Sequence, residues 1–291
     1  MSPRLNFSFW FLILFISAPF LAEAKNPPAS IFNASTKVEL VFKENVKGLG
    51  NNFSGVDYVV SKNHYFILDD DCRVFEVKIE NKAMVLVRTV LLNGFKDCEA
   101  IVHLPSQSEP GMIRMAVAEE RRGTMVLFDL KDHVPMVART EAKVFHVDKM
   151  TSFLHGNSGL EAMAVDDTFS DHPMFYFGKE EFPRRVYHGL FNEAGELVMM
   201  SPWDAEEKLP KGSDIAELYF VEGKLLVLDQ RGSVIRQVHP KTGDLISELK
   251  LPPSGWSKYE GMTVFRRGPK LLEMMLVAEK HVVLFFYIKQ G

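Results

Sequence analysis

The amino-acid sequence predicts a single all-β domain, a five-bladed β-propeller made of four-stranded blades. One pattern of short apolar strands occurs five times, and no helical periodicity of useful length follows residue 24. The fifth repeat ends before a fourth strand, whereas one unmatched strand precedes the first repeat. Repeats of roughly 40 to 50 residues with three or four short strands are typical of propeller blades.

Residues 1–24 have the features of a signal peptide. Arg4 precedes an apolar run from Phe7 to Phe15, and Ala22-Glu23-Ala24 offers a small-x-small cleavage site. We therefore expect a periplasmic or secreted protein, with residues 25–36 as a linker and residues 37–291 as the propeller. The alternative is an uncleaved segment that anchors the chain to the inner membrane through residues 5–21, which would be its only membrane contact.

Each repeat opens with a short strand that carries a small or acidic residue near its start. The five strands are Phe53–Tyr58, Cys98–Val102, Leu160–Ala164, Ile215–Tyr219 and Tyr259–Thr263. The equivalent residues within them are Ser54, Glu99, Glu161, Ala216 and Glu260. A sixth blade is disfavoured, because the long second repeat contains no further strand that ends in acids.

A second and a third strand follow in every repeat, rich in the branched and aromatic residues that strands require. The second strands, most of which end in acids, are Tyr65–Asp70, Met115–Glu120, Phe175–Glu180, Leu225–Gln230 and Met275–Lys280. The third strands are Val74–Val77, Met125–Phe128, Val186–His188, Val234–Val238 and Val282–Phe285.

The fourth strands indicate how the ring closes. Four repeats have one: Met84–Leu91, a stretch within Met136–Val147, Glu196–Met200 and Leu245–Leu249. The fifth repeat stops at Gly291 after its third strand, and the unmatched strand Lys37–Phe42 lies near the start. We expect that strand to form the outer edge of the fifth blade, so that no long bare edge remains.

Composition limits the function classes. The chain has 291 residues, 46 % hydrophobic and 25 % charged, with a net charge of −4. This is ordinary globular composition, and without a basic surplus we expect no nucleic-acid partner. The two cysteines cannot form a cysteine cage for zinc. No HExxH, GxSxG or P-loop pattern supports a zinc protease, an α/β-hydrolase or an NTPase.

Six short motifs follow one another in a fixed order along the chain. They are Asn52–Val56, Asp97–Ile101, Val117–Arg122, Gly159–Met163, Gly178–Glu180 and Tyr259–Met262. With these motifs the chain resembles the SdiA-regulated (YjiK/CarP-like) family of exported bacterial β-propellers, from about Lys37 to the end. The resemblance implies a calcium-binding propeller linked to calcium homeostasis, with a distant likeness to phytase-type propellers. Two departures stand out: Ala216-Glu217 replaces the expected Ser-Gly, and Cys98 occupies a position where Pro is common.

The predicted blades gather acidic side chains at one mouth of the channel, because the start of the first strand and the end of the antiparallel second strand lie on the same face. All-oxygen ligands favour Ca²⁺ over Zn²⁺. We expect Glu99, Glu161 and Glu260 as the inner calcium ligands. The outer or water-mediated ligands would be Glu119, Asp69, Asp229 and Glu279.

Four arginines follow the acidic strand ends: Arg73, Arg121, Arg184 and Arg231. They could contact a small anionic ligand such as a phosphate or carboxylate. The favoured interpretation is that they pair with neighbouring acids and tie blade to blade. Ion pairs with these arginines are also the alternative to a metal ion as the groups that balance the charge of Glu99, Glu161 and Glu260.

The two cysteines lie at the same face of neighbouring blades. Cys72 falls in the turn after the second strand of blade one, and Cys98 precedes the first strand of blade two. We predict a disulfide between them, with two free thiols as the alternative.

Two functions remain. The first is an exported calcium-binding propeller with a role in calcium response or homeostasis, whose other partner would be a small anionic ligand or a protein at the channel mouth. The second is a calcium-dependent hydrolase of phosphate or carboxyl esters. The sequence favours the non-enzymatic function, because it offers no general base or nucleophile distinct from the metal ligands.

Overall fold

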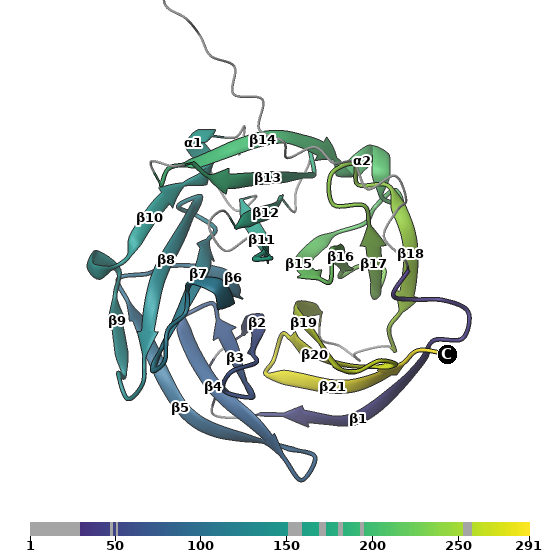
Figure 1. Ribbon diagram of the computed structural model, residues 1–291, viewed down its shortest axis with the longest axis horizontal. Helices are drawn as coiled ribbons and strands as arrows, with labels where there is room; N and C mark the ends of the chain where they lie inside the picture. The colour runs from purple at the N-terminus through teal and green to yellow at the C-terminus, as the bar shows by residue number, and fades with distance from the viewer. Residues whose placement is uncertain are drawn as a thin grey trace, which may run out of the picture.

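Five β-sheets lie in a ring around a common axis, each with its first strand innermost (Figure 1). The computed structural model describes residues 30–46, 49–50, 52–150, 159–168, 173–179, 183–192, 195–252 and 258–291. The predicted signal peptide and the first part of the predicted linker lie outside these residues. Over the described part of the chain, no helix has the length and apolar character needed to span a membrane.

The strands confirm the predicted five blades. Blade one contains β2 (Phe53–Val59), β3 (His64–Asp69), β4 (Arg73–Glu80) and β5 (Ala83–Asn93). Blade two contains β6 (Cys98–His103), β7 (Met112–Glu119), β8 (Thr124–Lys131) and β10 (Lys143–His146). Blade three contains β11 (Leu160–Asp166), β12 (Met174–Lys179), β13 (Arg185–Phe191) and β14 (Leu197–Asp204). Blade four contains β15 (Ile215–Val221), β16 (Lys224–Asp229), β17 (Val234–Val238) and β18 (Leu245–Lys250). Blade five contains β19 (Tyr259–Gly268), β20 (Leu271–Ala278), β21 (Val282–Lys289) and β1 (Lys37–Asn45).

Blade one carries a fifth strand that the sequence did not indicate. The short strand β9 (Met136–Ala138) pairs in parallel with β5, from Leu91↔Met136 to Asn93↔Ala138. A 3₁₀ turn at Arg139–Glu141 separates β9 from β10, the outer strand of blade two. The stretch expected to hold one strand therefore contributes to two neighbouring blades and covers the edge of the first.

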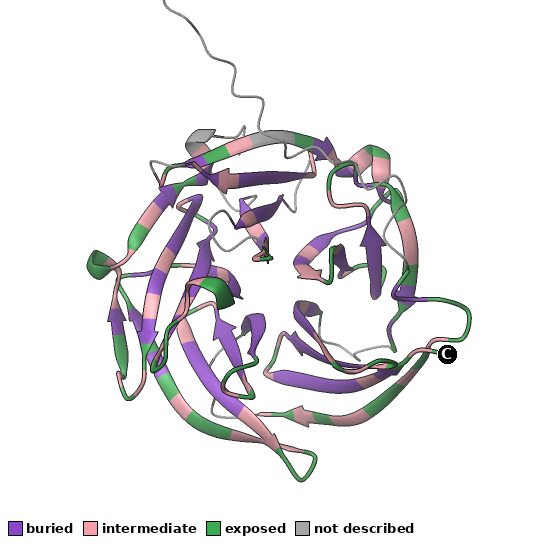
Figure 2. Ribbon diagram, in the orientation of Figure 1, coloured by how far each residue is buried: buried purple, intermediate pink, exposed green. Residues whose placement is uncertain are grey.

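The hydrophobic core is divided into five clusters, and each lies between two adjacent blades. Buried residues dominate the inner strands, while the outer strands alternate between buried and exposed (Figure 2). The innermost strands approach so closely that a Cβ atom on Gly261 would lie 2.8 Å from the Cα atom of Gly55. Each blade is thus held by its two neighbours, and stability depends on the ring being complete.

The N-terminal strand closes the ring as predicted. β1 pairs antiparallel with β21 over the whole span from Lys37↔Lys289 to Asn45↔Val282. Upstream of it, Ile31 and Phe32 are buried in the cluster between blades four and five. The Ile31 N–H donates a hydrogen bond to the Gln237 side-chain oxygen at 2.7 Å. Part of the segment expected as a linker therefore packs against the propeller.

A disulfide joins the first two blades. It links Cys72, in the β3–β4 turn, to Cys98, at the start of β6, with a Cα–Cα distance of 5.3 Å. Both cysteines are buried in the cluster between blades one and two.

We predict that removing the closing strand destabilises the whole ring. Deleting residues up to Phe42 should lower Tm by at least roughly 10 °C, because burial of Ile31 and Phe32 alone contributes about 3–6 kcal/mol and the edge of β21 becomes bare. Deleting only residues 1–29 is the control and should leave Tm unchanged. Equal melting temperatures for the two truncated proteins would contradict closure by β1.

A second prediction concerns the cysteines. Thiol titration of the unfolded, unreduced protein should detect no reactive thiol, and titration after reduction should detect two. Two reactive thiols before reduction would show that the disulfide does not form.

Candidate metal centre

Every innermost strand carries a β-bulge at the position that the repeat analysis aligned. The register between the first and second strands shifts by one residue in each blade. The extra residues are Ser54, Glu99, Glu161, Ala216 and Glu260. A bulge leaves its extra residue out of the strand ladder and re-aims its side chain. Three glutamates are therefore presented at the same mouth by the same backbone device.

Three carboxylates converge at this mouth on blade two. Asp97, Glu99 and Glu120 each offer an oxygen atom, and these atoms all lie within 4.8 Å of one another. Asp97 precedes β6 in a left-handed conformation with φ of 54°, and Glu120 follows β7. The Glu120 N–H donates to the Asp97 carbonyl oxygen at 2.9 Å, which holds the two ends together. This group, which we call the acidic triad, could hold a metal ion.

Burial and neighbouring carboxylates disfavour full ionisation of the acidic triad. Burial raises the pKa of Glu99 to about 8, and the nearby Asp97, Glu120, Glu260 and Asp70 charges add to the effect. Burial also raises the pKa of Glu120. Asp97 pairs with Arg121 at 2.8 Å. Within the described residues neither Glu99 nor Glu120 forms an ion pair, so burial favours their protonated forms and a bound cation would favour the ionised forms.

The other two bulge glutamates lie beside the acidic triad and outside it. Glu161 hydrogen-bonds to Glu120, a contact that favours the ionised form of Glu120 and lowers its pKa. Glu260 accepts a hydrogen bond from the Gln230 amide at 2.7 Å, and its charge reaches Glu99. The structure thus places the three predicted inner ligands, Glu99, Glu161 and Glu260, at one mouth. Of these three, Glu99 is the one that belongs to the acidic triad.

The predicted outer ligands are turned into their own blades. Asp69 accepts hydrogen bonds from the backbone N–H and Nε of Arg73 at 2.7 and 2.9 Å. Glu119 pairs with Arg122 at 2.7 Å and with Arg139 at 2.8 Å.

Asp229 accepts N–H groups of Asp214 and Gly232 at 3.0 and 3.1 Å and pairs with Arg236. Glu279 faces Lys258 at 3.8 Å. None of the four outer acids belongs to the acidic triad. Asp69, Glu119 and Asp229 are the last residues of their second strands and are held by groups near the turns that follow, whereas Glu279 lies one residue beyond the end of β20.

The four arginines pair with acids in nearby turns and in the connections between blades. Arg73 pairs with Asp69 and Asp71, and Arg121 with Asp97. Arg184 contacts Glu206 at 2.6 Å, and Arg231 contacts Asp214 at 3.0 Å. The expected pairing with neighbouring acids is therefore seen. Arg121, Arg184 and Arg231 pair with acids of the connections between blades, and each predicted anion contact already has a carboxylate partner.

A further buried acid, Glu217, comes from the departure in repeat four. The residue after the bulge is small in the other blades: Gly55, Ala100, Ala162 and Gly261. In blade four this position is Glu217, which is 2 % exposed and accepts the N–H groups of Leu218 and Met163 at 2.9 and 3.3 Å. Burial raises its pKa well above the usual range, with the Asp57 and Glu99 charges adding.

Sequence analysis missed Asp97 and Glu120 as members of the site. Both were visible in the quoted motifs, but Asp97 precedes the first strand and Glu120 is the second of two consecutive acids. The sequence did contain one signal for Glu120. It follows Glu119, the last residue of the second strand, and successive side chains of a strand point to opposite sides, so Glu119 and Glu120 cannot both face the same way.

Comparison with known proteins places the chain in a family. The model of the family described as SdiA-regulated matches residues 28–267, so the chain belongs to the SdiA-regulated family. No curated protein matches the sequence.

Two solved structures are similar. A glutaminyl cyclase from Myxococcus xanthus has a TM-score of 0.54 and 10 % identity, with 87 % of this chain and 96 % of that chain covered. Sqt1 from Saccharomyces cerevisiae has a TM-score of 0.39 and 10 % identity, covering 82 % and 72 %. The likeness to the cyclase shows the propeller fold alone, and the likeness to Sqt1 carries no argument.

Proposed function

We propose that this member of the SdiA-regulated family is an exported calcium-binding propeller that acts in calcium response or homeostasis. The observation that carries the proposal is the acidic triad of Asp97, Glu99 and Glu120, whose oxygens lie within 4.8 Å of one another. Three carboxylates in a partly buried site repel one another, and a divalent cation removes that repulsion.

The donor set favours Ca²⁺. The acidic triad contains only oxygen ligands, whereas Zn²⁺ sites in proteins are built mainly from histidine and cysteine. Ca²⁺ takes six to eight oxygens and accepts mono- or bidentate carboxylates in irregular geometry. Glu161 and Glu260 flank the triad and would supply further oxygens directly or through water.

The bound ion would act on the ring as well as on the triad. Asp97 and Glu99 flank Cys98, whose disulfide ties blade two to blade one. A ligand that binds only the folded ring stabilises it by RT ln(1 + [Ca²⁺]/Kd), about 2.7 kcal/mol at a hundredfold excess over Kd. The free energy of unfolding would thereby increase with the calcium concentration.

Export is part of the proposal. It rests on the apolar segment and small-x-small site within residues 1–24. The Cys72–Cys98 disulfide also supports it, because disulfides persist in oxidising compartments such as the periplasm. We do not propose the hydrolase alternative, since the arginines expected to hold an anionic substrate are paired with carboxylates.

We predict that Ca²⁺ raises Tm and that the acidic triad is responsible. At a hundredfold excess over Kd the shift should be roughly 5–10 °C for a domain of this size. Glu99→Gln should reduce the shift by more than half, because it removes one ligand charge and keeps the side-chain shape. The matched control is Glu248→Gln, since Glu248 is an exposed glutamate of β18 outside the acidic triad.

Differential scanning calorimetry of the three proteins, with Ca²⁺ and with a chelator, provides the measurement. A full wild-type shift in Glu99→Gln would remove the triad from the calcium site. An equal loss in Glu248→Gln would show that the effect is general surface charge.

A second prediction concerns pH in the metal-free protein. An acid whose pKa rises on folding binds its proton more tightly in the folded state, so its contribution to stability falls as pH rises. For Glu99 the fall spans pH 4.5, the usual value, to about 8, the folded value. The Tm of Glu99→Gln minus that of wild type should therefore increase across this range and then level off. Thermal unfolding in chelator at half-unit pH steps tests this, and a difference that is constant with pH would refute a raised pKa.

A further inference from the structure

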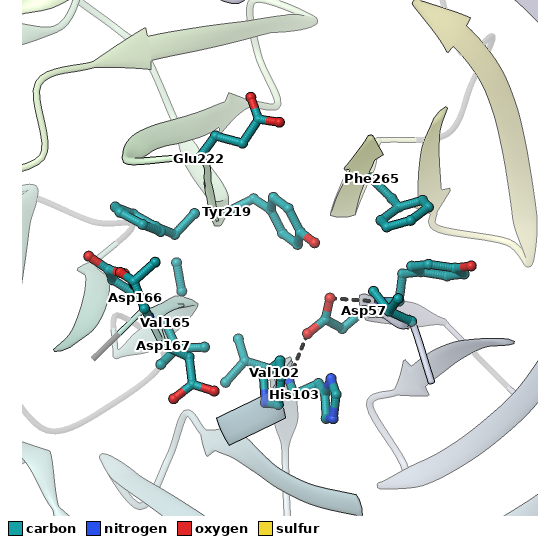
Figure 3. Close-up of a pocket in the computed structure, with 15 residues that line it drawn as sticks. Asp57, Val102, His103, Val165, Asp166, Asp167, Tyr219, Glu222 and Phe265 are labelled. Carbon is teal, nitrogen blue, oxygen red and sulfur yellow. Dashed lines mark hydrogen bonds between the residues drawn. The ribbon is translucent and has the colours of Figure 1, made fainter. Parts of the chain in front are cut away.

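A cavity of about 260 Å³ lies at the opposite end of the channel, where the innermost strands end. All five blades contribute to its wall, with residues such as Asp57, Val102, Val165, Tyr219 and Phe265 (Figure 3). At ~30 Å³ per water molecule, this space is equivalent to about nine waters. It therefore suits a small organic molecule better than a single inorganic ion.

Much of the wall is apolar and aromatic. Tyr58, Phe220 and Phe265 line the cavity together with the aliphatic side chains of Val102 and Val165. Aromatic faces attract cations, and they also pack against methyl and methylene groups. The Arg267 guanidinium already lies 5.7 Å from the centroid of Tyr58 and 5.2 Å from that of Phe265, so these two rings offer the cavity their remaining surfaces.

The charged groups in the wall are negative. Four carboxylates line the cavity, and no lysine or arginine is among the described lining residues. Glu222 is balanced by Arg266, with Nη2 and Oε2 2.9 Å apart. In the described part of the chain, Asp57, Asp166 and Asp167 form no ion pair. Burial lowers the pKa of His103 to about 4, so this imidazole is neutral near pH 7.

Asp57 supplies a buried charge inside the cavity. Its side chain points toward the middle of the cavity, as does the Tyr219 ring (Figure 3). The carboxylate accepts the N–H groups of Tyr58 and His103 at 2.7 and 2.6 Å, and the hydroxyl of Thr263 at 3.4 Å. These neutral donors fix the carboxylate without cancelling its charge. Asp57 is 6 % exposed, and a charge so buried is stabilised by a cationic partner.

We propose that this cavity binds a small organic cation, a quaternary or protonated amine. The ammonium charge lies near Asp57, and its alkyl groups pack against Tyr58, Phe220 and Phe265. Asp166 and Asp167 add negative potential at the entrance. The cavity is separate from the acidic triad, so this inference goes beyond the proposed calcium function and stands or falls independently of it.

Isothermal titration calorimetry at pH 7.5 tests the proposal with choline and n-butylammonium as probes. Their uncharged counterparts of equal size are 3,3-dimethyl-1-butanol for choline and 1-butanol for n-butylammonium. At least one ammonium probe should bind at least tenfold more tightly than its counterpart, because a charge-assisted contact is lost in the alcohol. Asp57→Asn and Asp166→Asn should each weaken that binding, Asp57→Asn by roughly tenfold. Asp244→Asn is the control, since Asp244 is an exposed aspartate that does not line the cavity.

Three results would overturn the proposal. They are no binding of either ammonium probe at millimolar concentration, equal binding of the alcohols, and unchanged binding in both cavity variants. If Asp57→Asn does not fold, Asp166→Asn and the alcohol comparison decide. Glu99→Gln should leave ammonium binding unchanged. Loss of binding in this variant would be a fourth contrary result, because it would place the cation at the opposite mouth.

Discussion

Burial of carboxylates, together with their repulsion where they lie close, is the constraint on which the channel depends. The innermost strands place Glu99, Glu217 and Asp57 along one narrow axis, and each has a raised pKa because burial disfavours its charged form. Backbone N–H groups orient Glu217 and Asp57, but they do not neutralise them. Burial therefore favours the protonated forms of these acids, and a cation at either mouth would favour the ionised forms.

The ring tolerates this repulsion because its stability comes from elsewhere. Five hydrophobic clusters, one at each interface between blades, supply the favourable free energy of burial. Closure by β1 makes those interfaces mutually dependent, and the Cys72–Cys98 disulfide fixes the interface beside the acidic triad. The bulges then aim side chains into the channel without breaking the sheets that carry them. Strain and charge are concentrated where the surrounding structure determines the geometry most strongly.

The sequence predicted the architecture well because repetition and apolar strand patterns are local signals. Blade number and closure by the N-terminal strand both follow from them, whereas the β-bulges at the aligned positions were not predicted. The site was predicted less well, because which acid faces the channel depends on alternation over one residue. Glu119 and Glu120 are adjacent, yet the first pairs with arginines in its own blade and the second joins the acidic triad. The position of β9 could not be predicted either, because it depends on contact with a neighbouring blade.

The central claim is that Asp97, Glu99 and Glu120 hold one calcium ion between them. A crystal structure of the protein grown in Ca²⁺, with an anomalous difference map, tests it most directly. The account predicts one strong peak at roughly 2.3–2.6 Å from oxygens of all three carboxylates. A map with no peak at this position, in which the three carboxylates bond to one another or to basic side chains, would contradict it.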